Sequence, residues 1–445
     1  MVSNELLEQL KRAFTDRQLY LVGGAVRDEL LGRPTQDLDF ATDCRPEETR
    51  ARVADWADAV WAVGEKFGTI GLQLGEAKAE ITTFRADTYD GSGRHPTVTY
   101  GNSILDDLAR RDFTINALAK NVHTGEVIDP YHGQTDLQAH VVRFVGEPSR
   151  RIREDPLRLL RAVRFCAQLD FSLEENARLA IRELAGEITR ISWERIRDEY
   201  DYILSSANAA AGLRQLIELG LAHHTLSELE QLRLPQPPHR HLKDVLEHTL
   251  EAVELTPSDK LLRWTLLLHD IAKPATFSQD EAGNIHFYRH EEIGAEMAQQ
   301  ILIRLRQPHD FIVRVKKLIH HHLRIPSYRP EWSDAALRRL MYDLGEEFAA
   351  AVEVAQADVR ASHIVPGDDF SARLEHLLAR VRQIGEAAEI ARMKPLLGGE
   401  EVMVLLGLTP GPKVGEVLRY LLSEQIEGRI TTPEEARAAI LQRFA

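Results

Sequence analysis

Apolar and polar positions change their spacing along this chain of 445 residues, and the change predicts two kinds of structure. Up to about residue 140, short apolar runs such as 19–22 and 69–74 alternate with helical spacings and with turns rich in Gly and charge. After about residue 150 the strand patterns disappear, and long segments of 3.6-residue period follow, among them 157–169 and 193–204. The pattern predicts an α+β fold class, with a mixed-sheet head followed by an all-α remainder.

Breaks in this pattern suggest the domain boundaries. The Pro-rich stretch 234–238 reads as a linker, a helical block rich in histidine follows it, and the last segment is helical with a break at 409–412. We therefore expect a head over 1–145, a helical neck over 146–233, a histidine-rich domain over 239–364 and a helical tail over 366–445.

Composition narrows the class of protein. The net charge of −14 argues against indiscriminate binding to nucleic acid, although a local basic groove remains compatible with it. The chain has no apolar run of membrane-spanning length and no signal-peptide core near its N-terminus. Its two cysteines, Cys44 and Cys166, exclude a disulfide framework and suit a reducing compartment. We expect a soluble, cytoplasmic protein.

Two aspartates close behind a Gly-Gly turn form the first candidate site. Residues i and i+2 of a strand point to the same face, so Asp37 and Asp39 are expected to project together. Adjacent carboxylates repel each other unless a cation binds them, and Mg²⁺ prefers oxygen ligands. The turn at Gly23 and Gly24 leaves backbone N–H groups for a phosphate. The arrangement predicts a nucleotidyl-transfer site; the alternative is a solvated pair at a strand end.

Two later segments extend this site. Glu80, in a predicted strand, is either a third carboxylate or a surface residue, and the sequence leaves both open. Arg110 and Arg111 offer forked donors that suit a triphosphate, and Asp112 is an acceptor for a ribose hydroxyl. A surface ion-pair cluster is the alternative, but the apolar residues that follow at 113–117 favour an ordered site.

The segment 150–165 carries charged residues at helical spacing. Pro156 lies in the first turn of the predicted helix, and Glu154, Arg158 and Arg161 are expected on one face of it. Asp155 with Arg158 presents one acceptor edge and one donor fork, which can read the edge of a base. Intrahelical ion pairs on an amphipathic helix are the alternative that this pattern leaves open.

The order of these motifs resembles that of class II tRNA nucleotidyltransferases, the bacterial CCA-adding and poly(A) polymerase family of the polymerase-β-like superfamily. The matching motifs are Gly-Gly-x-Val-Arg-Asp, Asp-x-Asp, Arg-Arg-Asp-Phe-Thr-Ile-Asn-Ala, Asp-Pro-x-x-Gly-x-x-Asp-Leu and Glu-Asp-Pro-x-Arg-x-x-Arg-Ala-x-Arg-Phe. The resemblance covers about residues 18–200 and includes the segment 191–196, which is similar to the family's neck-helix motif. It implies a polymerase-β-like head.

The resemblance also implies roles for individual residues. It implies that Asp37 and Asp39 bind the catalytic Mg²⁺ and that Asp155 and Arg158 select CTP or ATP. The residues implied in nucleotide binding are Gly24, Arg27, Arg111, Asp112, Asp155, Arg158, Arg161 and Arg164. The implied reaction is attack of a tRNA 3′-hydroxyl on the α-phosphate, with release of pyrophosphate, and the neck and tail are expected to contact the RNA.

The histidine-rich block carries a second candidate site. His269 and Asp270 end an apolar helix, where neither belongs unless it is paired or bound to a metal. Imidazole with carboxylate suits a divalent metal that activates water for phosphoester hydrolysis. The residues His248, His269, Asp270 and Asp358 resemble the H…HD…D signature of the HD phosphohydrolase superfamily. His290 and His321 resemble the extra histidines of some members. A second divalent metal is therefore implied, with hydrolysis as an additional activity.

Several functions remain open at this stage. The leading reading is complete CCA addition; enzymes that add only CC or only A carry nearly the same motifs. CC-adding members lack a flexible loop in the head, and the segment 85–100 reads as such a loop, which favours A addition. A poly(A) polymerase is disfavoured because no extended basic tail is present. An HD-type hydrolase with a degenerate head is disfavoured because the head motifs are intact. Oligomeric state and the HD substrate stay open.

Overall fold

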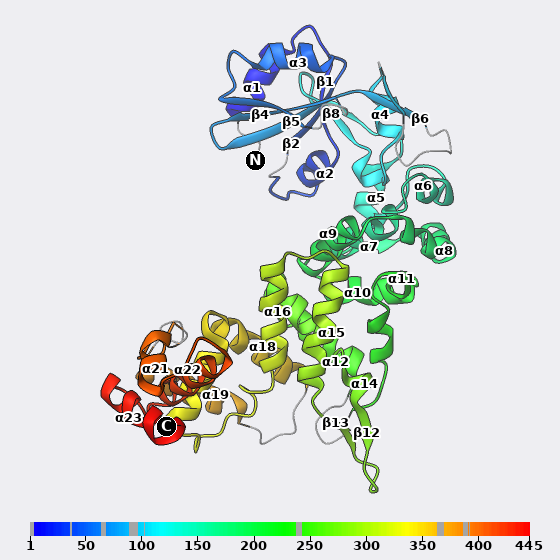
Figure 1. Ribbon diagram of the computed structural model, residues 1–445. Helices are drawn as coiled ribbons and strands as arrows, with labels where there is room; N and C mark the ends of the chain where they lie inside the picture. Colours follow the sequence, from blue (N-terminus) through cyan, green and yellow to red (C-terminus); the bar gives the residue numbers. More distant parts are fainter. Residues whose placement is uncertain are drawn as a thin grey trace. The chain divides into compact units, whose positions relative to one another are not determined.

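The computed structural model describes residues 4–35, 38–63, 68–88, 97–101, 103–236, 243–362, 369–385, 390 and 392–445. Asp37 and the middle of the expected loop, 89–96, lie outside the described residues. The chain forms two compact units (Figure 1). The first unit comprises Met1–Ile203 with Arg214–Thr225, and the second comprises Leu204–Leu213 with Leu226–Ala445.

The head of the first unit is built on a seven-stranded sheet in the order β3-β4-β5-β2-β1-β8-β9. Its strands are β1 Leu19–Val22, β2 Leu38–Thr42, β3 Ala59–Val63, β4 Thr69–Leu74, β5 Ala77–Thr83, β8 Ala119–Asn121 and β9 Val127–Ile128. β2 and β5 run parallel, and the other neighbours run antiparallel. The predicted mixed sheet is confirmed.

Alternating burial along the strands decides which side chains leave the core. In β5, Ala79 and Ile81 are buried, whereas Lys78 and Glu80 are exposed, as the two-residue period of a strand requires. In β2, Asp39 is exposed between two buried neighbours. Asp39 and Glu80 are also Cα partners in the parallel pair. The two carboxylates therefore project side by side from the same face of the sheet.

Helices and a hairpin complete the head. α3 packs against β4 and β5, α1 packs on α3, and α2 follows β1 directly (Figure 1). The bounds are α1 Asn4–Ala13, α2 Gly24–Leu30, α3 Pro46–Val53, α4 Ile104–Ala109, η2 Thr114–Asn116 and α5 Gly133–Ala139. β6 Arg85–Thr88 pairs antiparallel with β7 Thr97–Tyr100, so the ends of the predicted loop are a β-ladder, and the prediction of a loop from residue 85 to 100 is wrong there.

The neck consists of short helices and one two-residue strand, β11 Ser172–Leu173, which pairs with β10 Val141–Val142; the sequence had predicted helices only. One predicted helix is also divided. α6 Pro148–Glu154 ends before Asp155, whose φ of −145° and ψ of 101° are extended, and α7 Arg158–Leu169 follows. A proline disfavours helical geometry in the residue before it, so Pro156 explains the break. Glu154 and Arg158 therefore belong to different helices, and their predicted place on one helix face is wrong. The neck continues with α8 Glu175–Leu184, η3 Ala185–Arg190, α9 Trp193–Leu204 and α11 Leu221–Thr225.

The second unit is helical apart from one small hairpin. Its elements begin with η4 Ser227–Leu232, α12 Val245–Glu254, α13 Lys260–Leu268 and α14 Lys273–Thr276. The hairpin β12 Phe277–Gln279 and β13 Ile285–Phe287 follows; the sequence had predicted helices only. Then come α15 His290–Arg304, α16 His309–His321, α17 Asp334–Leu344, η5 Gly345–Glu347, α18 Phe348–Ala361 and α19 Phe370–Ile384.

The C-terminal helices have a small core of their own. They are α21 Gly399–Leu406, α22 Pro412–Ile426 and α23 Pro433–Phe444, and a cluster that includes Val402, Val417 and Ile440 is buried among them. α10 Ala209–Glu218 connects parts of both units along the chain. Among the described residues, no helix is long and apolar enough to span a membrane. The predicted α+β fold class is confirmed.

Candidate functional site

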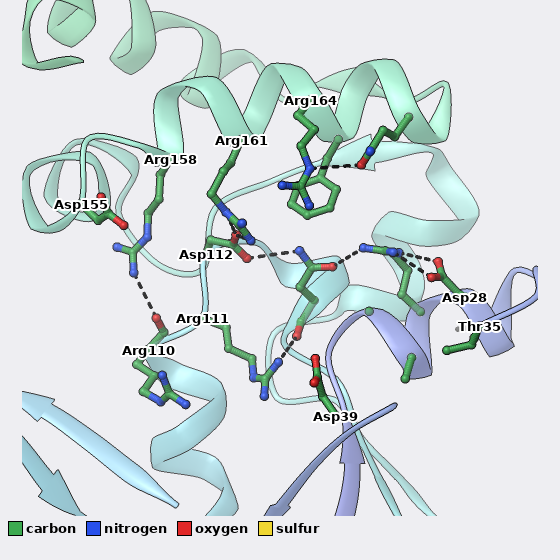
Figure 2. Close-up of a pocket in the computed structure, with 16 residues that line it drawn as sticks. Asp28, Thr35, Asp39, Arg110, Arg111, Asp112, Asp155, Arg158, Arg161 and Arg164 are labelled. Carbon is green, nitrogen blue, oxygen red and sulfur yellow. Dashed lines mark hydrogen bonds and ion pairs between the residues drawn. The ribbon is translucent and has the colours of Figure 1, made fainter. Parts of the chain in front are cut away.

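A cleft of about 530 Å³ in the first unit brings residues of the head and the neck together (Figure 2). Six arginines line it: Arg27, Arg110, Arg111, Arg158, Arg161 and Arg164. Four carboxylates also line it: Asp28, Asp39, Asp112 and Asp155. Arginine outnumbers carboxylate, so the cleft suits a polyanion such as a nucleoside triphosphate. Gly24, Ala25, Asn116 and Phe165, which also belong to the sequence motifs, line the cleft as well.

The metal-binding chemistry of the cleft depends on carboxylates at the strand β2. Asp39 lines the cleft, and its register partner Glu80 lies beside it on β5. Adjacent exposed carboxylates supply the oxygen ligands that a hard divalent cation prefers, so these residues fit such an ion. The role of Glu80 as a third metal-binding carboxylate stays a prediction. Its position beside Asp39 favours that role over the alternative of an isolated surface residue. The other member of the pair, Asp37, lies outside the described residues.

The Gly-Gly turn makes room for an arginine. Gly23 has a φ of +68°, and a Cβ at this position would lie less than 3.0 Å from Nη1 of Arg111. Arg111 donates hydrogen bonds to the backbone oxygen of Asn116 at 3.4 Å and to Oδ2 of Asp107 at 3.2 Å. The glycine therefore permits both the turn and the position of the guanidinium above it.

A buried aspartate orients the two adjacent arginines. Asp107 is 1% exposed; its Oδ1 accepts bonds of 3.0 and 2.7 Å from Nε and Nη2 of Arg110, and its Oδ2 accepts the bond from Arg111. Burial acts to raise the pKa of Asp107, but the two guanidinium groups outweigh it and lower that pKa. This arrangement disfavours a loose surface ion-pair cluster. Sequence reasoning missed Asp107, although its helical spacing of three and four from the arginines was a usable signal.

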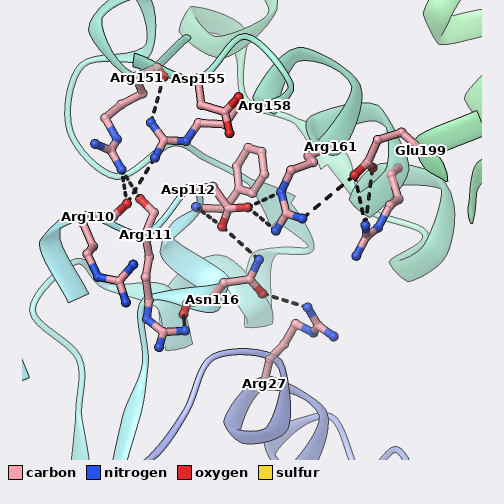
Figure 3. Close-up of polar contacts among 12 residues, drawn as sticks. Arg27, Arg110, Arg111, Asp112, Asn116, Arg151, Asp155, Arg158, Arg161 and Glu199 are labelled. Carbon is pink, nitrogen blue, oxygen red and sulfur yellow. Dashed lines mark hydrogen bonds and ion pairs between the residues drawn. The ribbon is translucent and has the colours of Figure 1, made fainter. Parts of the chain in front are cut away.

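Asp112 connects the head to the neck helix α7 (Figure 3). Its Oδ1 accepts bonds from the Phe113 N–H at 2.8 Å and from Nδ2 of Asn116 at 3.2 Å. Its Oδ2 accepts a bond from Nε of Arg161 at 2.7 Å. Burial would raise the pKa of Asp112, but Arg161 outweighs burial and holds it at about 2. Asp112 therefore positions Arg161 here, and its contact with a ribose stays a prediction.

The network continues into α2 through Asn116. Its Oδ1 accepts a bond of 2.7 Å from Nη1 of Arg27. Arg27 also forks onto Asp28 at 2.8 and 3.0 Å, and its guanidinium lies 5.3 Å from the centre of the Phe165 ring. Residues of the head therefore accept hydrogen bonds from both Nη1 and Nη2 of Arg27, which fixes the direction of its side chain along the cleft.

On the neck side, a buried glutamate anchors Arg161 and Arg164. Glu199 of α9 is 4% exposed and accepts a bond of 3.3 Å from Nη1 of Arg164, while Nη1 of Arg161 lies 4.0 Å away. Burial raises the pKa of Glu199, and the two arginines oppose this rise in part. Sequence reasoning missed Glu199. The signal was its place on the face of α9 that buries Ile196, Tyr200 and Ile203.

The predicted base-reading pair, Asp155 and Arg158, lines the same cleft (Figures 2 and 3). Arg158 is buried and donates to the backbone oxygens of Arg151 at 2.8 Å and of Arg110 at 3.2 Å. Its Nη1 also lies 3.1 Å from Oε2 of Glu154. Oδ2 of Asp155 accepts a bond of 3.0 Å from a more distant arginine of the neck motif, Arg195. Base recognition by this pair stays a prediction.

The second unit brings the four predicted HD residues together. Nε2 of His248 lies 3.0 Å from Oδ1 of Asp358, and Nε2 of His269 lies 3.1 Å from Oδ2 of Asp270. The four residues come from α12, from the turn after α13 and from α18. They are buried, apart from the slightly more accessible Asp358.

Of the two extra histidines that the sequence singled out, His290 lies in this site and His321 does not. Nε2 of His290 is 3.5 Å from Oδ1 of Asp270. The second histidine that groups with Asp270 and His290 is His322, and the predicted residue His321 is not in this group. His321 lies one residue earlier, is less buried, and has its ring against that of His320. Consecutive residues point in directions about 100° apart on a helix, so only one can enter the site.

The HD residues fit a divalent cation. Burial opposes charge on His269, but Asp270 and Asp358 outweigh burial and raise the pKa of His269 to about 10. Nδ1 of His269 lies 2.7 Å from the backbone oxygen of Leu266, which turns Nε2 toward the carboxylates. Positive charge is therefore favourable beside these two carboxylates, and a divalent cation held by the imidazole and carboxylate groups would supply it.

Comparison with known proteins identifies three matched regions. The Poly A polymerase head domain matches residues 19–143, the probable RNA and SrmB-binding site of polymerase A matches 170–232, and the HD domain matches 239–360. A structural match is the crystal structure of the Bacillus stearothermophilus CCA-adding enzyme in complex with CTP. It is 28% identical with a TM-score of 0.71, and the match covers 99% of this chain and 96% of that one.

Relatives along the whole chain fall into three kinds of tRNA nucleotidyltransferase. The A-adding tRNA nucleotidyltransferase of Deinococcus radiodurans is 38% identical over 96% of this chain and 95% of its own. The CC-adding enzyme of Thermus thermophilus is 35% identical, with 96% and 94% covered. The CCA-adding enzyme of Enterococcus faecalis is 30% identical, with 94% and 90% covered. The predicted resemblance is confirmed: the chain belongs to the tRNA nucleotidyltransferase family, whose members are enzymes, and carries an HD domain.

Proposed function

We propose that this protein adds nucleotides to the 3′ end of tRNA without a nucleic-acid template, using CTP and ATP with Mg²⁺ and completing the sequence CCA. The observation that carries the proposal is the cleft in which Asp39 of β2 faces six arginines of the head and neck. The printed activities of the relatives support the substrate class. A cytoplasmic location is part of this proposal, and its support is the low cysteine count and the tRNA substrate.

Different residues of the cleft bind the triphosphate and the metal ion. Arg110 and Arg111, fixed by Asp107, bind the triphosphate, and they meet it already oriented because their donors are held in place. The tRNA 3′-hydroxyl attacks the α-phosphate, and pyrophosphate leaves. Mg²⁺, when bound by Asp39 with its neighbouring carboxylates, supplies charge neutralisation at the phosphate oxygens and lowers the pKa of the attacking hydroxyl.

Selection of the base belongs to the neck. Asp155 offers an acceptor and Arg158 a donor, and the two replace the template strand. Asp112 holds Arg161, and Glu199 holds Arg164. These two side chains of α7 therefore keep the same direction whether CTP or ATP is bound. The neck and the tail contact the RNA in this proposal.

A-only addition is the second candidate activity. The A-adding enzyme of Deinococcus radiodurans shares 38% identity with this chain, more than the CC-adding and CCA-adding relatives above. An enzyme of this kind would leave CC addition to a partner enzyme and would accept only tRNA that already ends in CC.

One assay separates these activities. tRNA transcripts that end at the discriminator base, at C or at CC are incubated with CTP alone, ATP alone or both, and products are resolved at single-nucleotide length. Full CCA addition predicts extension of all three transcripts with both nucleotides. Addition of A only to the CC transcript would establish the second candidate, and long A tails on unrelated RNA would contradict both.

The HD site is assigned a divalent cation and phosphoester hydrolysis in this proposal. Its support is the convergence of His248, His269, Asp270 and Asp358 around two buried carboxylates. Elemental analysis of wild-type protein and of His269→Ala tests the assignment: metal that is lost only in the variant supports it, and equal metal in both contradicts it.

A further inference from the structure

Four residues form a row across the sheet of the head, on the face that carries Asp39. The register pairs Asp39 of β2 with Glu80 of β5, Glu80 with Gly71 of β4, and Gly71 with Trp61 of the edge strand β3. β4, β5 and β2 lie side by side in Figure 1. Because Cα partners of neighbouring strands project to the same face, Trp61 faces the same side of the sheet as the two carboxylates.

The indole of Trp61 is directed inward along this row. A Cβ built on Gly71 would lie less than 3.0 Å from Nε1 and Cε2 of the indole, so the ring lies directly over the glycine. Gly71 is buried, whereas 36% of Trp61 remains exposed. The ring is therefore placed above the sheet, where part of its π surface is accessible to a ligand.

The separation between the indole and Asp39 suits one nucleotide. Neighbouring strands lie about 4.8 Å apart, and β3 is three strands away from β2. Because the indole reaches over the strand next to its own, about two strand spacings, or roughly 10 Å, remain between the ring and β2. A nucleotide whose 3′-hydroxyl lies at the carboxylates can place its base at the indole.

The indole also lies on the side of Asp39 that suits the attacking hydroxyl. Arg111, which we assign to the triphosphate, lies over Gly23 at the end of β1, and α2 with Arg27 follows there. β1 adjoins β2 on one side, whereas β5, β4 and β3 lie on the other. Attacking and leaving oxygens are in line on opposite sides of the phosphorus. A triphosphate among the arginines therefore leaves the β5–β3 side to the RNA end.

Basic side chains on this face suit the RNA backbone. Nη2 of Arg85 donates a bond of 3.1 Å to Oγ1 of Thr69, which is two residues before Gly71 in β4 and so projects to the same face. Lys78 is exposed two residues before Glu80 in β5. Positive charge beside an exposed aromatic ring favours a ligand that carries both phosphate and base.

We propose that Trp61 stacks on the 3′-terminal base of the RNA substrate and thereby positions its hydroxyl beside Asp39; the proposal rests on nucleotidyl transfer at the cleft. Stacking on an aromatic side chain accepts every base, because each base has a π-face. This tolerance suits CCA addition, in which the terminal base differs from one tRNA to another and from one step to the next. Asp155 and Arg158 then read the incoming nucleotide, and Trp61 holds the end that receives it.

Steady-state kinetics test this role. Trp61→Ala is expected to lower kcat/KM for tRNA by about 5- to 150-fold, the loss typical of one stacked base, while the KM for the nucleotide at saturating tRNA stays at the wild-type value. Trp61→Phe retains a ring and should restore most of kcat/KM. Gly71→Ala, whose methyl group would displace the indole without removing it, should lower kcat/KM for tRNA as well.

A control variant on the same strand accounts for weakening of the sheet edge. Val60 precedes Trp61 and pairs with the buried Leu72, so it projects to the opposite face. Val60→Ala should keep the wild-type kcat/KM for tRNA, and circular dichroism checks that every variant is folded. A kcat/KM for tRNA that falls as far in Val60→Ala as in Trp61→Ala would assign the loss to the strand and overturn the proposal.

Photochemical cross-linking locates the terminal base without any variant. A tRNA that ends in 5-iodocytidine is bound to wild-type protein without nucleotide and irradiated, and the modified residue is identified by mass spectrometry of peptides. A cross-link at Trp61 is expected. Cross-links at other residues only would overturn the proposal, as would a wild-type kcat/KM for tRNA in folded Trp61→Ala.

Two further outcomes have separate meanings. If Trp61→Ala lowers the molar mass of the protein in solution and leaves kcat/KM for tRNA unchanged, the indole contacts a second copy of the chain and the proposal fails. The proposed function is tested independently, by whether the wild-type protein extends tRNA at all. Extension by wild type with no effect of Trp61→Ala would overturn the stacking role alone.

Discussion

Substitution of Gly23 by alanine isolates the part that Arg111 plays in nucleotide binding. The new methyl group would lie less than 3.0 Å from Nη1 of Arg111, and ordinary contacts begin near 3.5 Å, so the guanidinium must move by about 1 Å. The atom that the methyl group meets is the far end of a long side chain, so this shift costs little stability by itself. A displacement of about 1 Å at a substrate-positioning group lowers activity by roughly 10- to 100-fold. We expect Gly23→Ala to raise the KM for the nucleotide or lower kcat/KM by that factor.

Backbone strain is a second effect of the Gly23 substitution, and a control variant separates it from the displacement of Arg111. Gly23 has a φ of +68°, so alanine there adds about 1–3 kcal/mol of strain. Gly32 has a φ of +66° and no atom within 4 Å of a built Cβ, so Gly32→Ala keeps a comparable strain without the overlap. Thermal unfolding should show a loss in both variants, whereas steady-state incorporation of labelled nucleotide into tRNA should fall only in Gly23→Ala.

A double-mutant cycle decides whether the effect passes through the arginine. If the methyl group acts by displacing Arg111, then Gly23→Ala has little further effect on KM in an Arg111→Ala background. An undiminished effect in that background would refute the reasoning and assign the loss to the turn alone. Equal KM values in wild type and in the single Gly23→Ala variant would refute it as well.

Two further predictions concern titration. The pKa of Asp112 is about 2 against 3.8 for a free aspartate, a difference worth about 2.4 kcal/mol, since Arg161 stabilises the ionised form. That contribution is complete above about pH 4 and is lost as pH falls through 2. The loss in free energy of unfolding caused by Asp112→Asn, measured by urea denaturation, should therefore shrink by about 1 kcal/mol between pH 7 and pH 3. A loss that stays constant with pH would contradict this. Burial raises the pKa of Cys166 to about 12, and burial also raises the pKa of Cys44 above its usual value. Neither thiol of the native protein should therefore react with a disulfide reagent at pH 8, and rapid native labelling would contradict the burial.

Local pattern predicted many of the elements and singled out most of the residues that the structure brings together at the two sites. The apolar runs at 19–22 and 69–74 predicted β1 and β4, and the helical periods predicted α7 and α9. The break at Pro156 was also within reach, because a proline restricts the residue before it. It was missed because the charges on either side continue the helical spacing.

What the sequence could not supply was long-range register and helix phase. The adjacency of Asp39 and Glu80 depends on the parallel pairing of β2 with β5, which are separated in the chain by β3 and β4. The choice of His322 over His321 depends on how the end of α16 meets His269 and His290, and three consecutive histidines give no local signal. Glu199 carried a signal, but its arginine partners lie 35 and 38 residues earlier.

The central claim is that the cleft at β2 performs nucleotidyl transfer. The most direct test is single-turnover incorporation of an α-labelled nucleotide into tRNA by wild type, by Asp39→Asn and by the control Asp43→Asn, whose carboxylate lies just beyond β2 and accepts a bond from the Gln18 N–H. We predict that Asp39→Asn loses incorporation by about 10³-fold or more with its circular dichroism unchanged, because charge neutralisation at the phosphate is lost. The control should react at the wild-type rate. Incorporation by folded Asp39→Asn at the wild-type rate would contradict the claim.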